Sequence, residues 1–195
     1  MNFTAIDFET ANAQRDSACA LGMVRVEHGQ IVEEKSWLIC PPELYFNNIN
    51  VQIHGIRPSD VMHQPHFNEI WHELLPYLEN EIVLAHNASF DFSVLRACMN
   101  TYNITYPKLE YLCSVQISRL LWPQLENHKL DTMANFFRFP LKHHDAMDDT
   151  RACARITLEA CRASQSNGIE QLTDQLKIRP GKIDGSGYRA PKKLK

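Results

Sequence analysis

The sequence lacks an apolar run long enough to cross a bilayer, and no basic-then-apolar leader precedes its first predicted strand. It also lacks a C-x-x-C pair, although it has six cysteines. Several of these fall in strand or helix patterns, where cysteine behaves as a small apolar residue, so we expect reduced thiols and no disulfide framework. These absences argue against a membrane protein or a secreted one, and they favour the cytoplasm.

The composition is that of an ordinary globular protein, with 44% hydrophobic and 22% charged residues. A chain of 195 residues can form one well-cored domain and leaves little room for a second. We see no internal repeat. We place the domain at residues 1–163 and expect a basic, turn-rich C-terminal tail at 164–195, which could be a disordered arm, a phosphate-contacting strand or a docking segment.

The net charge of −3 is unevenly distributed. From Leu176 onward, seven basic residues stand against Asp184 alone, a net of +6, which leaves −9 for the rest of the chain. The overall charge argues against tight unspecific binding to duplex nucleic acid. It still permits short engagement of a strand end through metal ions and a few local contacts.

The first chemically informative feature is an acidic pair in the run Phe3–Thr10, which is apolar and rich in β-forming residues and predicts a strand. Side chains alternate along a strand, so Asp7 and Glu9 point to the same face. Two carboxylates at the end of a buried strand repel each other and are costly to desolvate. A divalent cation removes both penalties, and hard oxygen ligands suit Mg²⁺ or Mn²⁺.

A second acidic position follows the apolar segment 82–85, which predicts another buried strand. Asn87 or Ser89 can cap a helix after it, and this places Asp91 in the first turn, where the helix dipole favours a negative charge. The turn between strand and helix is where open α/β sheets place ligands.

A third acidic position precedes the last long amphipathic helix, predicted from about Asp145 to Cys161. Asp149 shares the apolar face of that helix, where packing alone would favour an apolar residue. His144 lies five residues earlier, so we expect it in the loop before the helix. Asp145 is expected to cap this helix, and His143 is expected to face solvent, although it remains a rival to His144.

Each of these residues also has an ordinary structural explanation. Asp7 and Glu9 could form an exposed strand end paired with basic groups, although the apolar neighbours imply burial. Asp91 alone is more often a plain first-turn carboxylate. Asp149 could be half of a buried ion pair with Arg151 or Arg155. Only the combination of the motifs favours a site.

The combination resembles a known family. Asp7-Phe8-Glu9-Thr10, the run from His86 to Asp91, and His144-x4-Asp149 look like the three motifs of the DEDD exonucleases, and the histidine spacing is that of the DEDDh branch, which includes the proofreading subunit of bacterial replicative DNA polymerase. The runs 51–56 and 127–130 also resemble the family. The resemblance extends from Met1 to about Cys161. Two departures, Thr150 and the Cys113-Ser114 pair, remove no catalytic position.

The resemblance implies a 3′→5′ exonuclease that uses two divalent cations, Mg²⁺ or Mn²⁺. It assigns the cations to Asp7, Glu9, Asp91 and Asp149, and it makes His144 the general base. A histidine with a pKa near neutral is a suitable proton acceptor. It further implies that a set of residues around the site contacts the last nucleotide, through backbone groups and stacking: Phe8, Thr10, His54, Gly55, Ile56, His86, Asn87 and Phe90.

The order of elements predicts an α/β protein. The first strand is followed by strands at about 20–26 and 31–39, joined by a glycine-containing hairpin. A loop follows to about Pro65, and then helices near 67–78, 92–99, 115–121 and 130–137 surround strands at 82–85 and 109–113. We therefore expect a mixed sheet of five strands, with the first three antiparallel and helices on both faces. This matches the ribonuclease H-like fold that the resemblance implies.

The function that these features favour is removal of 5′-mononucleotides from the 3′ end of single-stranded or frayed DNA. Trimming of RNA by the same site is an alternative. So is a non-catalytic nucleic-acid-binding module associated with a polymerase, although such a module would not need all five candidate catalytic residues. The expected partners are a DNA or RNA 3′ end and a DNA polymerase or repair protein. A ribonuclease H-type endonuclease also uses clustered carboxylates, but the histidine spacing favours the exonuclease.

Overall fold

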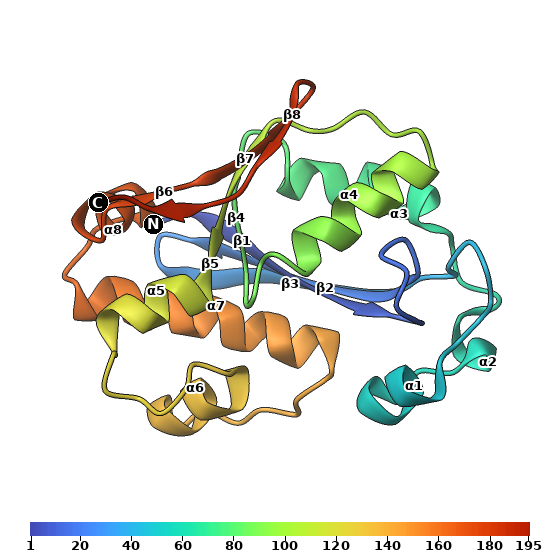
Figure 1. Ribbon diagram of the computed structural model, residues 1–195, viewed down its shortest axis with the longest axis horizontal. Helices are drawn as coiled ribbons and strands as arrows, with labels where there is room; N and C mark the ends of the chain where they lie inside the picture. The colour runs from blue at the N-terminus through green and yellow to red at the C-terminus, as the bar shows by residue number, and fades with distance from the viewer.

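The computed structural model describes residues 1–195 as a central sheet covered by helices on both faces (Figure 1). The main sheet has seven strands in the order β3-β2-β1-β4-β5-β7-β8, and β6 and β9 form a separate two-stranded sheet. The strands are β1 Phe3–Thr10, β2 Ala18–Glu27, β3 Gln30–Leu38, β4 Ile82–Ala85, β5 Leu109–Cys113, β6 Ile178–Arg179, β7 Gly181–Asp184, β8 Gly187–Arg189 and β9 Lys192–Lys193. The helices are α1 Asn48–His54, α2 Pro58–Val61, α3 Phe67–Leu74, the 3₁₀ turn η1 Leu75–Tyr77, α4 Asp91–Thr101, α5 Ser114–Leu121, α6 Leu130–Phe137, α7 Ala146–Ala163 and α8 Ile169–Gln175.

The mixed pairing of the sheet is as the element order predicts. β1, β2 and β3 are antiparallel neighbours, whereas β1 pairs with β4, and β4 with β5, in parallel. The β2–β3 hairpin turns at Gly29, which has a φ of 78°, a left-handed conformation that glycine adopts without steric cost. The carboxyl ends of β1 and β4 consequently lie together at one edge of the sheet, which is where open α/β sheets bind ligands.

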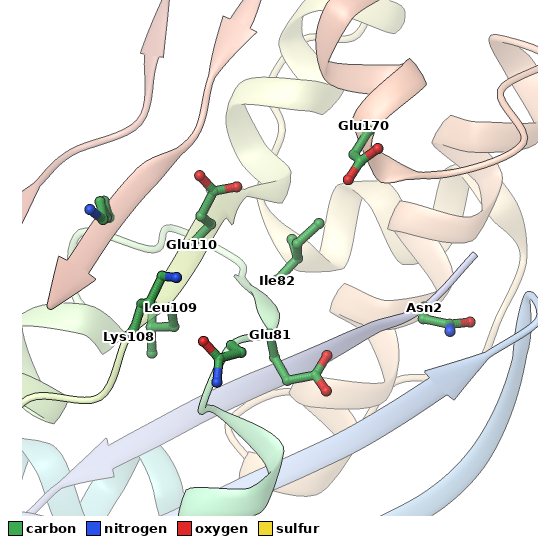
Figure 2. A pocket seen from close by; sticks show the side chains of 9 residues that line it. Asn2, Glu81, Ile82, Lys108, Leu109, Glu110 and Glu170 are labelled. Atoms are coloured by element: carbon green, nitrogen blue, oxygen red, sulfur yellow. The ribbon is translucent and has the colours of Figure 1, made fainter.

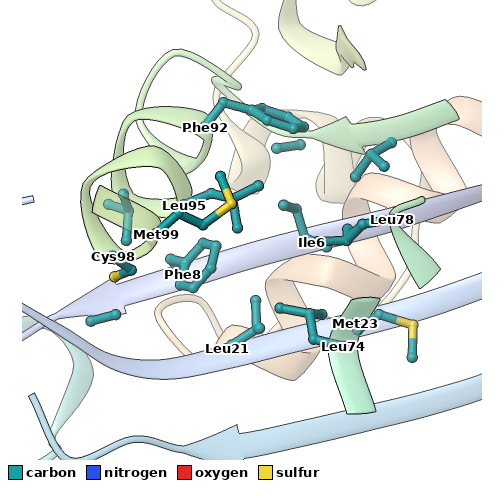
Figure 3. Packing of buried hydrophobic residues seen from close by; sticks show 14 of the residues in the cluster. Ile6, Phe8, Leu21, Met23, Leu74, Leu78, Phe92, Leu95, Cys98 and Met99 are labelled. Carbon is teal, nitrogen blue, oxygen red and sulfur yellow. The ribbon is translucent and has the colours of Figure 1, made fainter. Parts of the chain in front are cut away.

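Two apolar clusters pack on opposite faces of the sheet. Because side chains alternate between the two faces along β1, neighbouring residues of this strand belong to different clusters. Ile6 and Phe8 pack with α3 and α4 on one face (Figure 3), whereas Phe3 and Ala5 pack with α6 and α7 on the other. Asp7 and Glu9 have the parity of Phe3 and Ala5 and so point to the α7 face. All six cysteines are buried, and none of them is in a disulfide.

The predicted fold class is confirmed, but three details of the prediction are wrong. The sheet has seven strands instead of five, because β7 and β8, from the segment expected to be a tail, pair with β5 and with each other. The loop before Pro65 contains α1 and α2. The helix expected at 67–78 ends at Leu74 and continues as the 3₁₀ turn that includes Pro76, whose ring and missing N–H disfavour a longer α-helix.

No helix is both long and apolar enough to traverse a bilayer.

Close packing of β2 against α7 sets the position of the helix that carries Asp149. A Cβ at Gly22 would lie 2.3 Å from the backbone oxygen of Ala146 and 2.5 Å from Thr150 Oγ1. We expect Gly22→Ala to destabilise the protein by about 1–3 kcal/mol, because the start of α7 must move away from the sheet. Thermal unfolding measures this, with Gly185→Ala as the control, since a Cβ there meets nothing within 4 Å. Equal melting temperatures for the two variants would contradict this tight approach.

Candidate active site

Three carboxylates from two elements converge at the carboxyl end of β1. Asp7 and Glu9 project from β1, and Asp149 projects from the first turn of α7, which crosses that face of the sheet. One oxygen from each of these three side chains lies within 4.8 Å of the others. Asp149 is only 4% exposed and shares the buried face of α7 with Ala152, Cys153 and Ile156.

Asp91 approaches the same end of β1 from the opposite face. It is the first residue of α4 and is 1% exposed. Its Oδ1 accepts a hydrogen bond of 3.0 Å from the backbone N–H of Phe8, which stands between Asp7 and Glu9. The expected helix cap is wrong in detail, because Phe90 occupies the N-cap position without a side-chain bond, and Asn87 Oδ1 instead accepts from Ser89. Asn87 has a φ of 70°, which turns the chain sharply from β4 toward α4.

The four carboxylates have no arginine or lysine in an ion pair with any of them. The alternative partners of Asp149 lie elsewhere: Arg151 pairs with Glu34 and Asp148, and the guanidinium of Arg155 lies over the ring of Phe139. Apart from the contact of His143 with Asp149, the negative charge of the cluster has to be met by protonation or by a cation.

Burial, followed by repulsion within the cluster, raises the pKa of these groups. The pKa of Glu9 is raised to about 8 by burial and by Asp149 and Asp91. Burial raises the pKa of Asp91 to about 7, against the lowering effect of the Phe8 hydrogen bond. The pKa of Asp7 is well above its usual range, because of burial and then Asp91, and burial also raises that of Asp149. Such a set of oxygen donors fits hard divalent cations such as Mg²⁺ or Mn²⁺.

Two histidines stand beside Asp149 in the loop before α7. The backbone N–H of His144 donates to Asp149 Oδ2 at 3.0 Å, and His144 has a φ of 67°, so the loop is held in a left-handed bend. Its pKa is lowered from 6.5 by burial and by His143, which favours the neutral ring. The expected cap of α7 is confirmed, since the side chain of Asp145 accepts from the backbone N–H of Asp148.

His143 is an exposed loop residue, as expected, but it also contacts the site, which the sequence did not indicate. Its Nδ1 lies 2.9 Å from Asp149 Oδ2, and its ring stacks on that of His144 with centroids 3.9 Å apart. Sequence spacing could not place this side chain, because the left-handed residue that follows it turns the loop back over α7. His143 and His144 together with Asp149 thus form a second group of side chains with metal-ligand spacing.

The predicted nucleotide-contacting residues divide into two sets, and the first surrounds the end of β1. Phe8 is a core residue whose ring packs near Phe67, so only its backbone reaches the site. The carbonyl of Thr10 accepts from Asn50 Nδ2 at 2.8 Å and lies 3.2 Å from His54 Nε2. His54 Nδ1 accepts from the N–H of Ile56 after the turn at Gly55, which has a φ of 80°. No sequence pattern singles out Asn50, because its contact with Thr10 depends on α1, which was not predicted.

The second set follows β4. Both ring nitrogens of His86 are already engaged by the protein: Nδ1 lies 2.8 Å from Ser114 Oγ, and Nε2 lies 3.0 Å from the carbonyl of His128. Burial lowers the pKa of His86 to about 4, so this ring is neutral. Phe90 is partly buried beneath the guanidinium of Arg15, which lies 4.6 Å from the ring centroid.

A cavity of about 450 Å³ opens beside the carboxylates. It is lined by Asp7, Asp149 and His143 at one end and by residues of α5, α6 and the loop between them at the other. A second polar pocket, of about 480 Å³, lies at the amino ends of β1, β4 and β5 (Figure 2). Glu81, Lys108 and Glu110 line this second pocket, which is at the opposite end of the sheet from Asp7 and contains none of the candidate catalytic residues.

The fold and the acidic site together define a nuclease of the ribonuclease H-like type. The family model described as "Exonuclease" (RNase_T) matches residues 4–157, and the chain belongs to this family. It is therefore a hydrolase, and its motifs are those of the DEDDh exonucleases.

Relatives of known name agree with this family. The chain is 28% identical over 175 residues to the PolC-type DNA polymerase III of Caldanaerobacter subterraneus, covering 88% of this chain, and 29% identical over 180 residues to that of Thermotoga maritima, covering 91%. It spans only 12% and 13% of the lengths of these two polymerases.

Solved structures share the fold. Exonuclease X in complex with 5′ overhanging duplex DNA has a TM-score of 0.72 and 24% identity, covering 88% of this chain and 98% of that one. The nuclease domain of 3′hExo, a DEDDh family member bound to rAMP, has a TM-score of 0.69 and 14% identity, covering 83% and 92%. Exonuclease I of E. coli with a dA16 oligonucleotide has a TM-score of 0.69 and 18% identity, covering 90% and 42%.

The raised carboxylate pKa values predict how stability depends on pH and metal. With pKa values of about 7 and 8 for Asp91 and Glu9, the folded metal-free protein binds more protons than the unfolded chain, whose carboxyls titrate near 4. Stability without metal should therefore fall as the pH rises from about 5 to 8. Mg²⁺ or Mn²⁺ should raise the melting temperature more at pH 8 than at pH 6, because the ion displaces protons at the lower pH. A melting temperature in EDTA that rises over this range, with no metal effect, would contradict it.

Proposed function

We propose that the protein removes 5′-mononucleotides from the 3′ end of single-stranded or frayed DNA, using two divalent cations. The observation that carries the proposal is the convergence of oxygens from Asp7, Glu9 and Asp149 within 4.8 Å, with Asp91 bonded to the same strand. No lysine or arginine forms an ion pair with them, and His143 contacts only Asp149, so the cluster is suited to holding cations.

The residues divide the work as follows. Asp7, Glu9, Asp91 and Asp149 would hold Mg²⁺ or Mn²⁺, which when bound supply activation of the attacking water and stabilisation of the leaving 3′-oxygen. His144 accepts the proton of the water, since its lowered pKa keeps the ring neutral at pH 7. The left-handed bend and the hydrogen bond to Asp149 hold this histidine at the edge of the cluster.

The terminal nucleotide would bind at the end of β1. Backbone groups of Phe8 and Thr10, with the turn from His54 to Ile56, would contact its sugar and base, and the bonds of His54 to Thr10 and Ile56 support a common position for them. Asn87 and Phe90, which precede Asp91, would contact it from the α4 side. His86 would act by fixing the loop before α6, because both of its ring nitrogens are bonded to the protein.

The similarities favour DNA as the substrate. PolC is a DNA polymerase by name, and Exonuclease X and Exonuclease I were solved with DNA. We propose that a DNA polymerase or a repair protein is the partner, because the matching segment in PolC lies within a polymerase chain. Trimming of RNA is the second candidate, because the neighbour 3′hExo was solved with a ribonucleotide.

End-labelled oligomers test the proposal directly. DNA and RNA of one sequence, labelled at either the 5′ or the 3′ end, are incubated with Mg²⁺ or Mn²⁺, and the products are separated by length. We expect a ladder that shortens from the 3′ end, stronger on DNA, and absent in EDTA. Internal cuts, shortening from the 5′ end, or no cleavage of either polymer would overturn the assignment.

A further inference from the structure

The cavity beside Asp7 and Asp149 extends well beyond the carboxylates. Its far end is lined by Arg119 of α5 and by Asn127, His128 and Lys129 of the loop before α6. The proposed chemistry uses only the carboxylate end. The rest of the cavity is lined by polar residues that include two cations, Arg119 and Lys129, and we refer to this polar lining as the wall.

Hydrogen bonds hold this wall in place. The carbonyl of His128 lies 3.0 Å from His86 Nε2, and the ring of His128 in turn lies 3.0 Å from the carbonyl of Trp122. Asn127 Oδ1 accepts from the backbone N–H of Lys129 at 3.0 Å and from Thr132 Oγ1 at 2.7 Å. The α5–α6 loop is therefore fixed to the end of β4 and to the start of α6, which positions the backbone from which the Lys129 side chain extends.

The two cations have no partner within the protein. Arg119 and Lys129 are both exposed, and neither forms an ion pair with a carboxylate. By contrast, Arg25 and Arg151 each pair with glutamate. The residues proposed to contact the terminal nucleotide, from Phe8 to Thr10 and from His54 to Ile56, include no lysine or arginine.

We propose that Arg119 and Lys129 bind the phosphates of the substrate strand immediately upstream of the bond that is cleaved. This deepens the proposed function and rests on it. A phosphodiester strand whose terminal phosphate lies at the carboxylates must continue away from them, and this cavity offers a preformed cationic path. The contacts are to the backbone, so they act on any sequence.

A salt titration with a matched control tests the proposal. Binding of a 5′-fluorescein-labelled dT12 is measured by anisotropy with Mg²⁺, in the Asp7→Asn background to prevent cleavage. At 50 mM salt, the affinity of the double variant Arg119→Gln/Lys129→Gln should fall by roughly tenfold for each cation removed. The slope of its log affinity against log salt should be shallower by about 1.4, since each single-strand phosphate contact contributes about 0.7. Lys108→Gln/Lys182→Gln removes the same charge from the pocket at the opposite end of the sheet and should leave both quantities unchanged.

A second substrate separates this inference from the function itself. The p-nitrophenyl ester of thymidine 5′-phosphate has a scissile phosphate but no upstream ones. In a protein that keeps Asp7, the Arg119→Gln/Lys129→Gln double variant should retain its kcat/KM on this ester. Its kcat/KM on dT12 should fall at least tenfold. Equal losses on both substrates, or an unchanged salt slope, would overturn the inference. If the wild type cleaves neither substrate, the proposed function fails, and the salt slope still decides whether the cavity binds the strand.

Discussion

Asp7→Asn is expected to lower the rate of 3′-end cleavage by a factor on the order of 10³ or more, because metal-ion stabilisation of a phosphodiester transition state is worth several kcal/mol. Asp7 stands at the centre of the cluster, where its pKa is raised by burial and by Asp91, Asp149 and Glu9. The amide keeps the shape of the side chain and removes one negative charge. Single-turnover cleavage of labelled dT12 with saturating Mg²⁺ measures the loss.

The same substitution should stabilise the metal-free protein. Removing one of several mutually repelling buried carboxylates relieves electrostatic strain at pH 8, and we expect a gain of about 1 kcal/mol, or roughly 2–4 °C in melting temperature. Asp174→Asn, on the exposed side of α8, is the matched control and should change neither quantity. An active Asp7→Asn enzyme, or a loss of activity explained by unfolding, would remove the carboxylate cluster from the mechanism.

His144→Ala is expected to lower kcat by about 10²–10⁴-fold, the range for loss of a general base. The pKa of His144 is lowered from 6.5, so the wild-type rate should rise with pH at the acid end, level off near neutrality, and lose this acid limb in the variant. A kcat–pH profile from pH 5 to 8, at saturating Mn²⁺, measures both effects.

His143→Ala is the matched comparison, because the two rings stack and both lie near Asp149. We expect a loss of about tenfold with the acid limb retained, since His143 positions Asp149 and its neighbour without accepting the proton. If the limb disappears in His143→Ala and persists in His144→Ala, the role of base passes to His143.

Much of the fold and site follows from local patterns in the chain. The alternation around Asp7 and Glu9 predicted a strand with both carboxylates on one face, and β1 has that arrangement. The 3.6-residue pattern around Asp149 predicted the buried face of α7, and Asp145 caps that helix as expected. These predictions succeed because the direction of a side chain and the capping of a helix depend on residues within one helical turn or one pleat of a strand.

Other features depend on residues far apart in the chain, and only the tertiary structure decided them. Turn-forming residues at 179–182 and 184–188 favoured a tail without fixed structure, with a strand as one alternative. The edge of β5 pairs with β7, and this makes β7 and β8 part of the sheet. His143 is exposed, as its loop position predicts, but only the bend at His144 shows that its ring also reaches Asp149. The sequence by itself determined which residues are the candidates for the chemistry, because the spacing within each motif is local. Which cations and loops surround them was decided by packing between α5, α6 and the end of β4, where the two hydrogen bonds of His86 join residues 28 and 42 positions apart.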